Sequence, residues 1–155
     1  MPEKVIAQLL KEGKLKKQEA GFVQVEQLLI QSLCDLKEAS KIRHIAETAT
    51  YIMAYNGMLK AGRALLLLRG FVPDDGAQHR TVVEVTTAIL GQKFKKVTAH
   101  FEIMRKKRNE MTYEAGAMVS KHETERAFED AIKMLEAIFE EVKAKNPQLE
   151  IKFEI

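Results

Sequence analysis

The residues with the clearest chemical potential lie in one short stretch, residues 104–114. Four consecutive cations, Arg105 to Arg108, are followed by Asn109 and Tyr113. On a helix, Arg108 is the next position of an apolar seam that recurs at spacings of three and four, made of Phe94, Val97, Phe101 and Met104. A guanidinium that faces other helices is costly unless an anion or a hydrogen-bond partner meets it. Arg108 is therefore either a ligand-binding residue or a side chain that snorkels past Met104 to solvent at the end of a bundle.

The elements that position this stretch all have helical periodicity. Amphipathic patterns with turn signals between them predict helices over 4–11, 17–39, 43–69, 77–90, 92–112 and 120–145. The segment 43–69 has two apolar stripes, from Ile45 to Leu66 and from Tyr51 to Leu68, and is expected to be the longest and the central helix. The fold class predicted is all-α, an antiparallel up-and-down four-helix bundle with one or two extra short helices. Residues 1–147 form one domain, and residues 148–155 form an extended C-terminal tail whose alternation is the only strand pattern.

Several local features refine this prediction. Ser120 and Glu123 have the spacing of a capping box, which starts the last helix. Gly70 to Gly76 is predicted to be a loop, with Asp74-Asp75-Gly76 as a turn. The lysines at 14, 16 and 17 are expected in or beside a solvated turn. Cys34, inside the second helix, is interpreted as a core or boundary thiol.

Composition and counting exclude many classes of function. The 155 residues, 46% hydrophobic and 30% charged, suit one globular domain, and the net charge is only +3. One cysteine excludes an intramolecular disulfide and a cysteine–histidine zinc site. No histidine has glutamate three residues before it, and no glycine-rich phosphate loop or serine elbow is present. No cofactor and no metal are expected, and without a signal-peptide pattern or a membrane-length apolar run the predicted location is cytoplasmic.

Three pieces of the chain, in their order, resemble the HEPN superfamily of small α-helical domains. They are the alanine-rich helix that ends at 61–70, the loop that leads to Gln78-His79, and Arg105 to Asn109 followed by Tyr113. Together they span about residues 43–142. The resemblance implies metal-independent RNA cleavage at a dimer interface, with an arginine on the scissile phosphate and a histidine four to six residues later that assists attack by the 2′-OH.

The chain departs from that family motif at one position. Arg108 and Asn109 match its first two residues, but Tyr113 stands where the histidine is expected. A phenol is a poor general base at neutral pH. The resemblance thus assigns Arg108, Asn109 and Tyr113 to the catalytic position of a degenerate site, which binds RNA or a nucleotide and cuts slowly or not at all.

Two functional hypotheses follow. In the first, the chain is a homodimeric RNA- or nucleotide-binding domain of a toxin–antitoxin or defence system, at most a weak metal-independent endoribonuclease. A basic face would then hold the nucleic acid, made of Lys93, Lys96, Arg105, Lys106 and Lys107. In the alternative, the chain is a non-enzymatic interaction protein that docks on a nucleotidyltransferase antitoxin, which suits the near-neutral charge and the acidic last helix.

Overall fold

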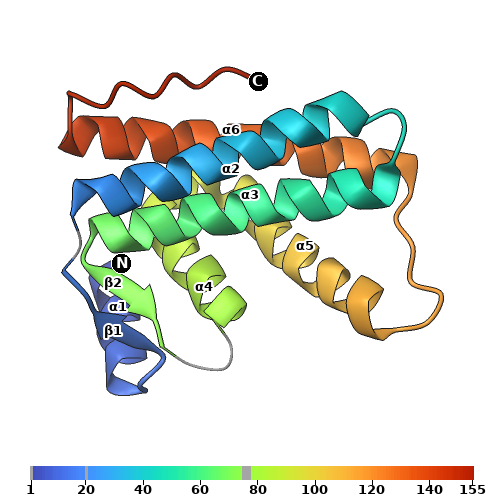
Figure 1. The fold of residues 1–155 in the computed structure, drawn as a ribbon. Coiled ribbons are helices and arrows are strands. Elements are labelled where there is room, and N and C mark those ends of the chain that lie inside the picture. The colour runs from blue at the N-terminus through green and yellow to red at the C-terminus, as the bar shows by residue number, and fades with distance from the viewer. Residues whose placement is uncertain (1, 20, 75–77) are drawn as a thin grey trace.

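Four long helices and two shorter ones form most of the chain. A computed structural model describes residues 2–19, 21–74 and 78–155. The elements in order are α1 (Pro2–Lys11), β1 (Leu15–Lys17), α2 (Phe22–Ile42), α3 (Glu47–Leu68), β2 (Phe71–Pro73), α4 (Gln78–Leu90), the short 3-10 helix η1 (Gln92–Phe94), α5 (Lys95–Tyr113) and α6 (Lys121–Lys145). Figure 1 shows α2 and α3 as an antiparallel hairpin, with α6 alongside both. The predicted all-α helical bundle is confirmed.

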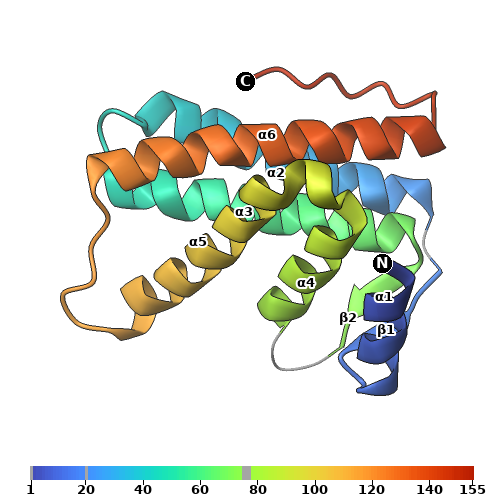
Figure 2. The same ribbon diagram turned by 180° about the vertical axis from the view of Figure 1, so that it is seen from behind.

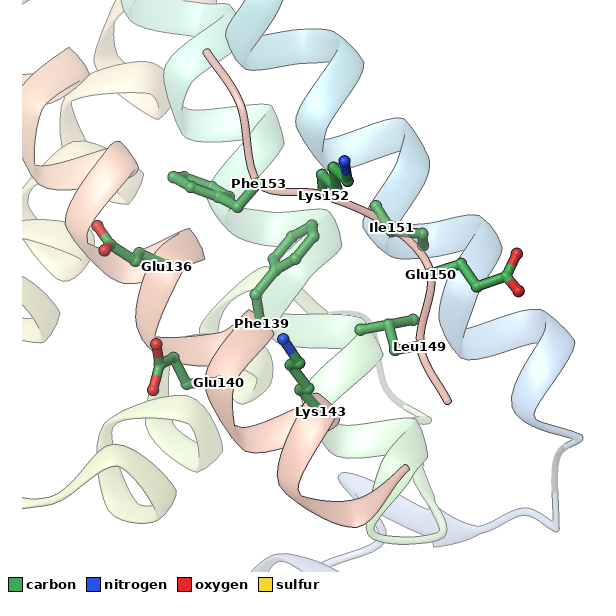
Figure 3. A pocket seen from close by; sticks show the side chains of 9 residues that line it. All are labelled: Glu136, Phe139, Glu140, Lys143, Leu149, Glu150, Ile151, Lys152 and Phe153. Atoms are coloured by element: carbon green, nitrogen blue, oxygen red, sulfur yellow. The ribbon is translucent and has the colours of Figure 1, made fainter. Parts of the chain in front are cut away.

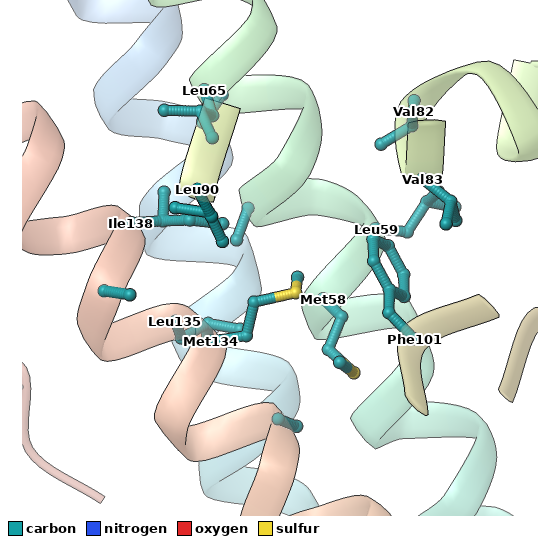
Figure 4. Packing of buried hydrophobic residues seen from close by; sticks show 14 of the residues in the cluster. Met58, Leu59, Leu65, Val82, Val83, Leu90, Phe101, Met134, Leu135 and Ile138 are labelled. Atoms are coloured by element: carbon teal, nitrogen blue, oxygen red, sulfur yellow. The ribbon is translucent and has the colours of Figure 1, made fainter. Parts of the chain in front are cut away.

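The helix α3 is the centre of the bundle, as its two apolar stripes predict. It packs against α2, α6, α4 and α5. Figure 4 shows Met58, Leu59 and Leu65 of α3 between two groups of side chains. One group comes from α4 and α5 (Val82, Val83, Phe101), and the other from the last residue of α4 and the interior of α6 (Leu90, Met134, Leu135, Ile138). Burial on several sides explains why α3 contains so few charged residues.

The start of α6 agrees with the sequence prediction, whereas the start of α3 differs from it. At the start of α6, the Glu123 backbone N–H donates to Ser120 Oγ at 3.0 Å, and the Ser120 N–H donates to Glu123 Oε1 at 3.0 Å. The predicted capping box is confirmed. The prediction that 43–69 is the longest helix is wrong, because α3 begins at Glu47 and has 22 residues, whereas α6 has 25. The reason is that Ile45, counted in the apolar stripe, lies in the α2–α3 turn and is 82% exposed.

A small sheet was not predicted. The strands β1 and β2 pair antiparallel, with Lys16 opposite Val72, and Lys16 Nζ lies 3.7 Å from Asp74 Oδ1. Three-residue strands are too short to show alternation, and their pairing depends on the α2–α3 hairpin that brings them together. Lys16 and Lys17 are exposed beside the turn at 12–14, as expected, but they belong to a strand. The proposed Asp74-Asp75-Gly76 turn falls partly outside the described residues.

The C-terminal tail lies on the bundle without forming a strand. Leu149 is buried, and the ring of Phe153 meets the ring of Phe139 of α6 edge to face at 5.2 Å between centroids. Figure 3 shows Leu149 and Phe153 on the side of Phe139, whereas Glu150 points away. The alternation therefore separates a side that contacts α6 from a side that faces solvent.

Two further findings concern single features. Cys34 is exposed on α2, so its interpretation as a core or boundary thiol is wrong. Its helix neighbours Leu33 and Leu36 occupy the buried side instead. Within the part of the chain that the structure describes, no helix has both the length and the apolar character needed to cross a bilayer.

Candidate anion-binding site

A hydrogen bond between Tyr55 of α3 and His79 of α4 is the centre of the candidate site. The Tyr55 hydroxyl oxygen lies 2.9 Å from His79 Nδ1. The tyrosine ring is fully buried and also contacts Phe101 of α5, with ring centroids 5.9 Å apart. Tyr55 therefore joins the three helices at one point.

Three guanidinium groups act electrostatically on this pair. Arg63 lies two turns after Tyr55 on α3, and its Nη2 donates to Gln78 Oε1 at 3.2 Å. Arg105 of α5 pairs with Glu102 at 2.6 Å. The charges of Arg63, Arg105 and Arg108 all act on both Tyr55 and His79. We call Tyr55, Arg63, His79, Arg105 and Arg108 the arginine–histidine cluster.

The cluster includes residues from two helices that diverge from one another. Figure 2 shows α4 and α5 diverging from their junction, so that the start of α4 and the end of α5 are far apart. His79 is in the first turn of α4, and Arg108 is in the second half of α5. His79, Arg63, Arg105 and Arg108 are all half-buried and so retain contact with solvent. The positive end of α4 lies at the same place and favours anions there.

The surroundings of His79 favour a neutral imidazole. Burial lowers the pKa of His79 below its ordinary value of 6.5, and the charges of Arg108, Arg63 and Arg105 lower the pKa further. Burial raises the pKa of Tyr55, so its hydroxyl keeps its proton at neutral pH. The cluster is thus cationic through its guanidinium groups while its imidazole is uncharged.

Among the described residues, the Arg108 side chain has no ion pair and no hydrogen bond. Its backbone oxygen accepts from Thr112 Oγ1 at 2.9 Å, which leaves the guanidinium uninvolved. Arg63 Nε is likewise buried without a hydrogen-bond partner. Buried donors of this kind are normally satisfied by protein, water or ligand. The N–H groups of Arg108 and Arg63 can donate hydrogen bonds to the oxygen atoms of an anion.

The structure does not bring the other two residues of the resemblance into the cluster. Asn109 is exposed on α5, and Tyr113, the last residue of that helix, is 76% exposed. In the described residues, neither side chain makes a hydrogen bond to a member of the cluster. Of Arg108, Asn109 and Tyr113, only Arg108 belongs to the site.

The five predicted nucleic-acid-binding cations lie on different sides of α5 and η1. Lys107 Nζ lies 3.7 Å from Glu123 of α6, whereas Arg105 belongs to the cluster on the α3 and α4 side. Lys96 lines a groove of about 410 Å³ between α5 and α6, together with His100, Ile103, His122 and Arg126. Lys93 lies beside Glu136, Glu140 and Glu141 of α6. Lys106 is exposed. Arg105 therefore lies apart from Lys93, Lys96 and Lys107, which are on the α6 side.

A second polar pair lies on the α6 side of α5. His100 Nδ1 is 2.6 Å from Asp130 Oδ2, and Lys133 is 3.8 Å from the other oxygen of that carboxylate. Within the described part of the chain, no three or more histidine, cysteine, aspartate or glutamate side chains are placed to hold a metal ion. The pair therefore has the geometry of a packing contact between α5 and α6.

Sequence reasoning assigned no role to Tyr55, Arg63 or His79. One signal was present, because Tyr55, Leu59 and Arg63 recur every four residues on a helix that is otherwise apolar. A guanidinium on the face of a central helix needs a polar neighbour, and the Gln78-His79 pair begins the next helix. What the sequence does not contain is the spatial arrangement that places these residues beside Arg108.

Comparisons with known proteins identify no relative, since no family model, no curated protein and no solved structure matches this chain.

Proposed function

We propose that this chain is a HEPN-like domain that binds RNA or a nucleotide through the arginine–histidine cluster. The observation that carries the proposal is the half-buried Arg108 guanidinium, which has no partner among the described residues and lies with two other guanidinium groups. Like charges held together are destabilising unless an anion compensates them. Arginine–phosphate pairs are short and often bidentate, so a phosphate group is the anion that suits the Arg108 guanidinium and the unpartnered Arg63 Nε, while Arg105 is already paired with Glu102.

The proposed activity is binding with slow cleavage or none. The residue at the position of the family's histidine, Tyr113, is exposed at the end of α5 and outside the cluster. It supplies neither an imidazole nor a contact to the phosphate site. A role in a toxin–antitoxin or defence system, in the cytoplasm, is the setting that the resemblance to HEPN domains supports.

Replacing Arg108 tests this proposal against a diffuse basic surface. We expect Arg108→Ala to lower the affinity for a fluorescein-labelled RNA or for AMP by about tenfold or more, since a charged hydrogen-bond donor is lost. Lys106→Ala is the matched control, because Lys106 is an exposed cation two residues away. Fluorescence anisotropy measures the first ligand and calorimetry the second. Equal losses in the two variants would refute a specific site at Arg108.

A second candidate function, docking on a protein partner, is favoured by exposed apolar side chains near the end of α5. Ile103 is 60% exposed, and Tyr113 and Met118 are each 76% exposed. Such residues are common at protein interfaces. The partner would be a second copy of the chain, or the nucleotidyltransferase antitoxin of the alternative hypothesis. Light scattering of wild type and Ile103→Glu tests the homodimer, and co-purification with a nucleotidyltransferase encoded next to this chain tests the other partner.

A further inference from the structure

We propose that His79 supplies the imidazole of a proton-coupled phosphate site, in which its Nε2–H donates to a phosphate oxygen and the ring takes up a proton when the phosphate binds. The inference deepens the proposed function, because it concerns the same cluster. The proposed function requires RNA or a nucleotide to bind. The inference requires only a phosphate group.

The first step of the argument is the tautomer of the neutral ring. The Tyr55 hydroxyl is buried, and its only hydrogen-bond partner among the described residues is His79 Nδ1, at 2.9 Å. If Nδ1 carried the proton, the tyrosine oxygen would accept and the hydroxyl hydrogen would have no acceptor. A buried donor without an acceptor costs about 1–3 kcal/mol. The hydroxyl therefore donates to Nδ1, and the ring proton lies on Nε2.

The second step is that Nε2 remains available. No hydrogen bond or ion pair in the described part of the chain uses this nitrogen, and the His79 side chain is half-buried. The ring is fixed by Tyr55 on its other side, with centroids 5.8 Å apart. A histidine held in this way presents one N–H donor in a constant direction, and the charges of Arg108 and Arg63 act on the same ring. Arg63 Nε is buried without a hydrogen-bond partner among the described residues.

The third step is the balance of charge around the ring. The polar and charged groups around the Tyr55–His79 pair are Arg63 on α3 with its partner Gln78 on α4, and Arg105 and Arg108 on α5 with Glu102, which pairs with Arg105. Three guanidinium groups against one carboxylate leave an excess of positive charge, which disfavours an imidazolium ion. A bound dianion reverses this effect, so the ring gains a proton from solvent. Nδ1 then donates to the Tyr55 oxygen, and both ring nitrogens are donors. The Tyr55 hydroxyl hydrogen loses its acceptor in this state, and the attraction between the imidazolium and the dianion must exceed that cost of about 1–3 kcal/mol.

Sulfate and inorganic phosphate are the probes that test this site. Sulfate stays a dianion throughout the range, so any proton taken up on binding belongs to the protein. We expect sulfate affinity to increase from about pH 8 to about pH 6, by at most about tenfold per pH unit, which is the limit for uptake of one proton. The pH dependence should be lost in His79→Gln. His100→Gln is the matched control, because it removes the histidine paired with Asp130 on the other side of α5.

The ring nitrogens of the wild-type protein give a direct readout that needs no variant. We expect ¹⁵N spectra of free His79 to show protonated Nε2 and unprotonated Nδ1, and sulfate to protonate both. A free ring with its proton on Nδ1, or His79 resonances unchanged at saturating sulfate, would overturn the inference. An unchanged pH dependence in a folded His79→Gln variant would overturn it too.

The same titrations separate this inference from the proposed function. If RNA binding depends on Arg108 but neither RNA nor sulfate affects His79, the inference fails and the proposed function stands. If sulfate and phosphate bind with proton uptake but RNA and AMP do not bind, the inference stands and the proposed function fails. Comparison of free phosphate, AMP and a short RNA at one pH identifies which source of the phosphate group the site prefers.

Discussion

Gly62 of α3 lies directly against Val82 of α4, so closely that a Cβ atom at Gly62 would be 2.7 Å from Val82 Cγ1. The same atom would be 2.8 Å from Thr86 Oγ1. The two helices can approach this far only because residue 62 has no side chain. Gly62 is one residue before Arg63. The contact therefore also sets how closely α3, which carries Tyr55 and Arg63, approaches α4, which carries His79.

Gly62→Ala should therefore destabilise the protein even though alanine favours helix. Alanine gains about 1 kcal/mol over glycine inside a helix. Overpacking a tight contact costs about 1–3 kcal/mol, and Val82 is a β-branched residue with little rotamer freedom. We expect a net loss of about 1 kcal/mol in the free energy of unfolding, measured by urea denaturation.

A double-mutant cycle tests the cause of that loss. Val82→Ala removes the methyl group that the new Cβ would meet, so the double variant should be more stable than the sum of the single effects predicts. Strict additivity would show that the contact with Val82 is not the source of the destabilisation.

The stability of the protein should depend on pH through His79. Its pKa is lowered in the folded state, so below about 6.5 the unfolded state binds more protons and stability falls as pH falls. Above that pH the ring is neutral in both states and the effect vanishes. His79→Gln should flatten this part of the curve, measured by thermal unfolding at a series of pH values. A curve of unchanged slope in the variant would contradict the prediction.

The cations of α5 should differ in their contribution to nucleic-acid binding. Lys107 pairs with Glu123, whereas Lys106 is exposed and Arg105 belongs to the cluster. We expect Lys106→Ala and Lys107→Ala to lower RNA affinity modestly and to reduce the salt dependence by at most about one counterion each. Titrations at several salt concentrations measure this slope. Losses of RNA affinity as large as the loss expected for Arg108→Ala would contradict this prediction.

Tyr113→His tests whether the family's histidine position is functional in this chain. The side chain is 76% exposed, so the substitution should leave stability nearly unchanged. If the position is the degenerate catalytic one, the variant should gain metal-independent RNA cleavage, because general acid–base catalysis is worth about 10²–10⁴-fold. A gel assay with chelator measures the gain, which should disappear when Arg108→Ala is added.

Tyr113→Phe is the matched control for that experiment. Brisk, chelator-resistant cleavage by wild type that persists in Tyr113→Phe would show that the site is not degenerate at this position, since a ring without its hydroxyl transfers no proton. A histidine variant that folds and binds RNA but does not cleave would show that position 113 is too far from the phosphate.

The helices were predictable because each one has its own periodic apolar seam and its own stop signal. The capping box at Ser120 and the central position of α3 follow from such local rules. The β1–β2 pair and the exposure of Cys34 depend instead on which helices become neighbours. Ile45 shows the limit of such local rules. It continues an apolar stripe of α3 but lies in the turn before the first residue of that helix.

The candidate site was predictable only on α5, at Arg105 as one cation of a basic face and at Arg108. The place of Arg108 at the end of an apolar seam is a local property of α5. The partners that give the position its meaning, Tyr55 and His79, are supplied by α3 and α4. A histidine a few residues after the arginine would lie on α5 or just after it. The imidazole on which the Arg108 charge acts, that of His79, lies on α4.

Pairing of β1 with β2 fastens the segment before α4 to the N-terminal end of the chain. The Gln18 N–H donates to the Gly70 oxygen at 2.8 Å, and the Asp74 N–H donates to the Lys14 oxygen at 2.9 Å, so the pairing continues at both ends. Strands this short open at a small fraction of the global free energy of unfolding. Hydrogen exchange at Lys16 and Val72 would then report a partial opening that frees the entry to α4 while the α2–α3 hairpin stays folded. Residues 15–17 of β1 thereby influence how long His79 stays hydrogen-bonded to Tyr55.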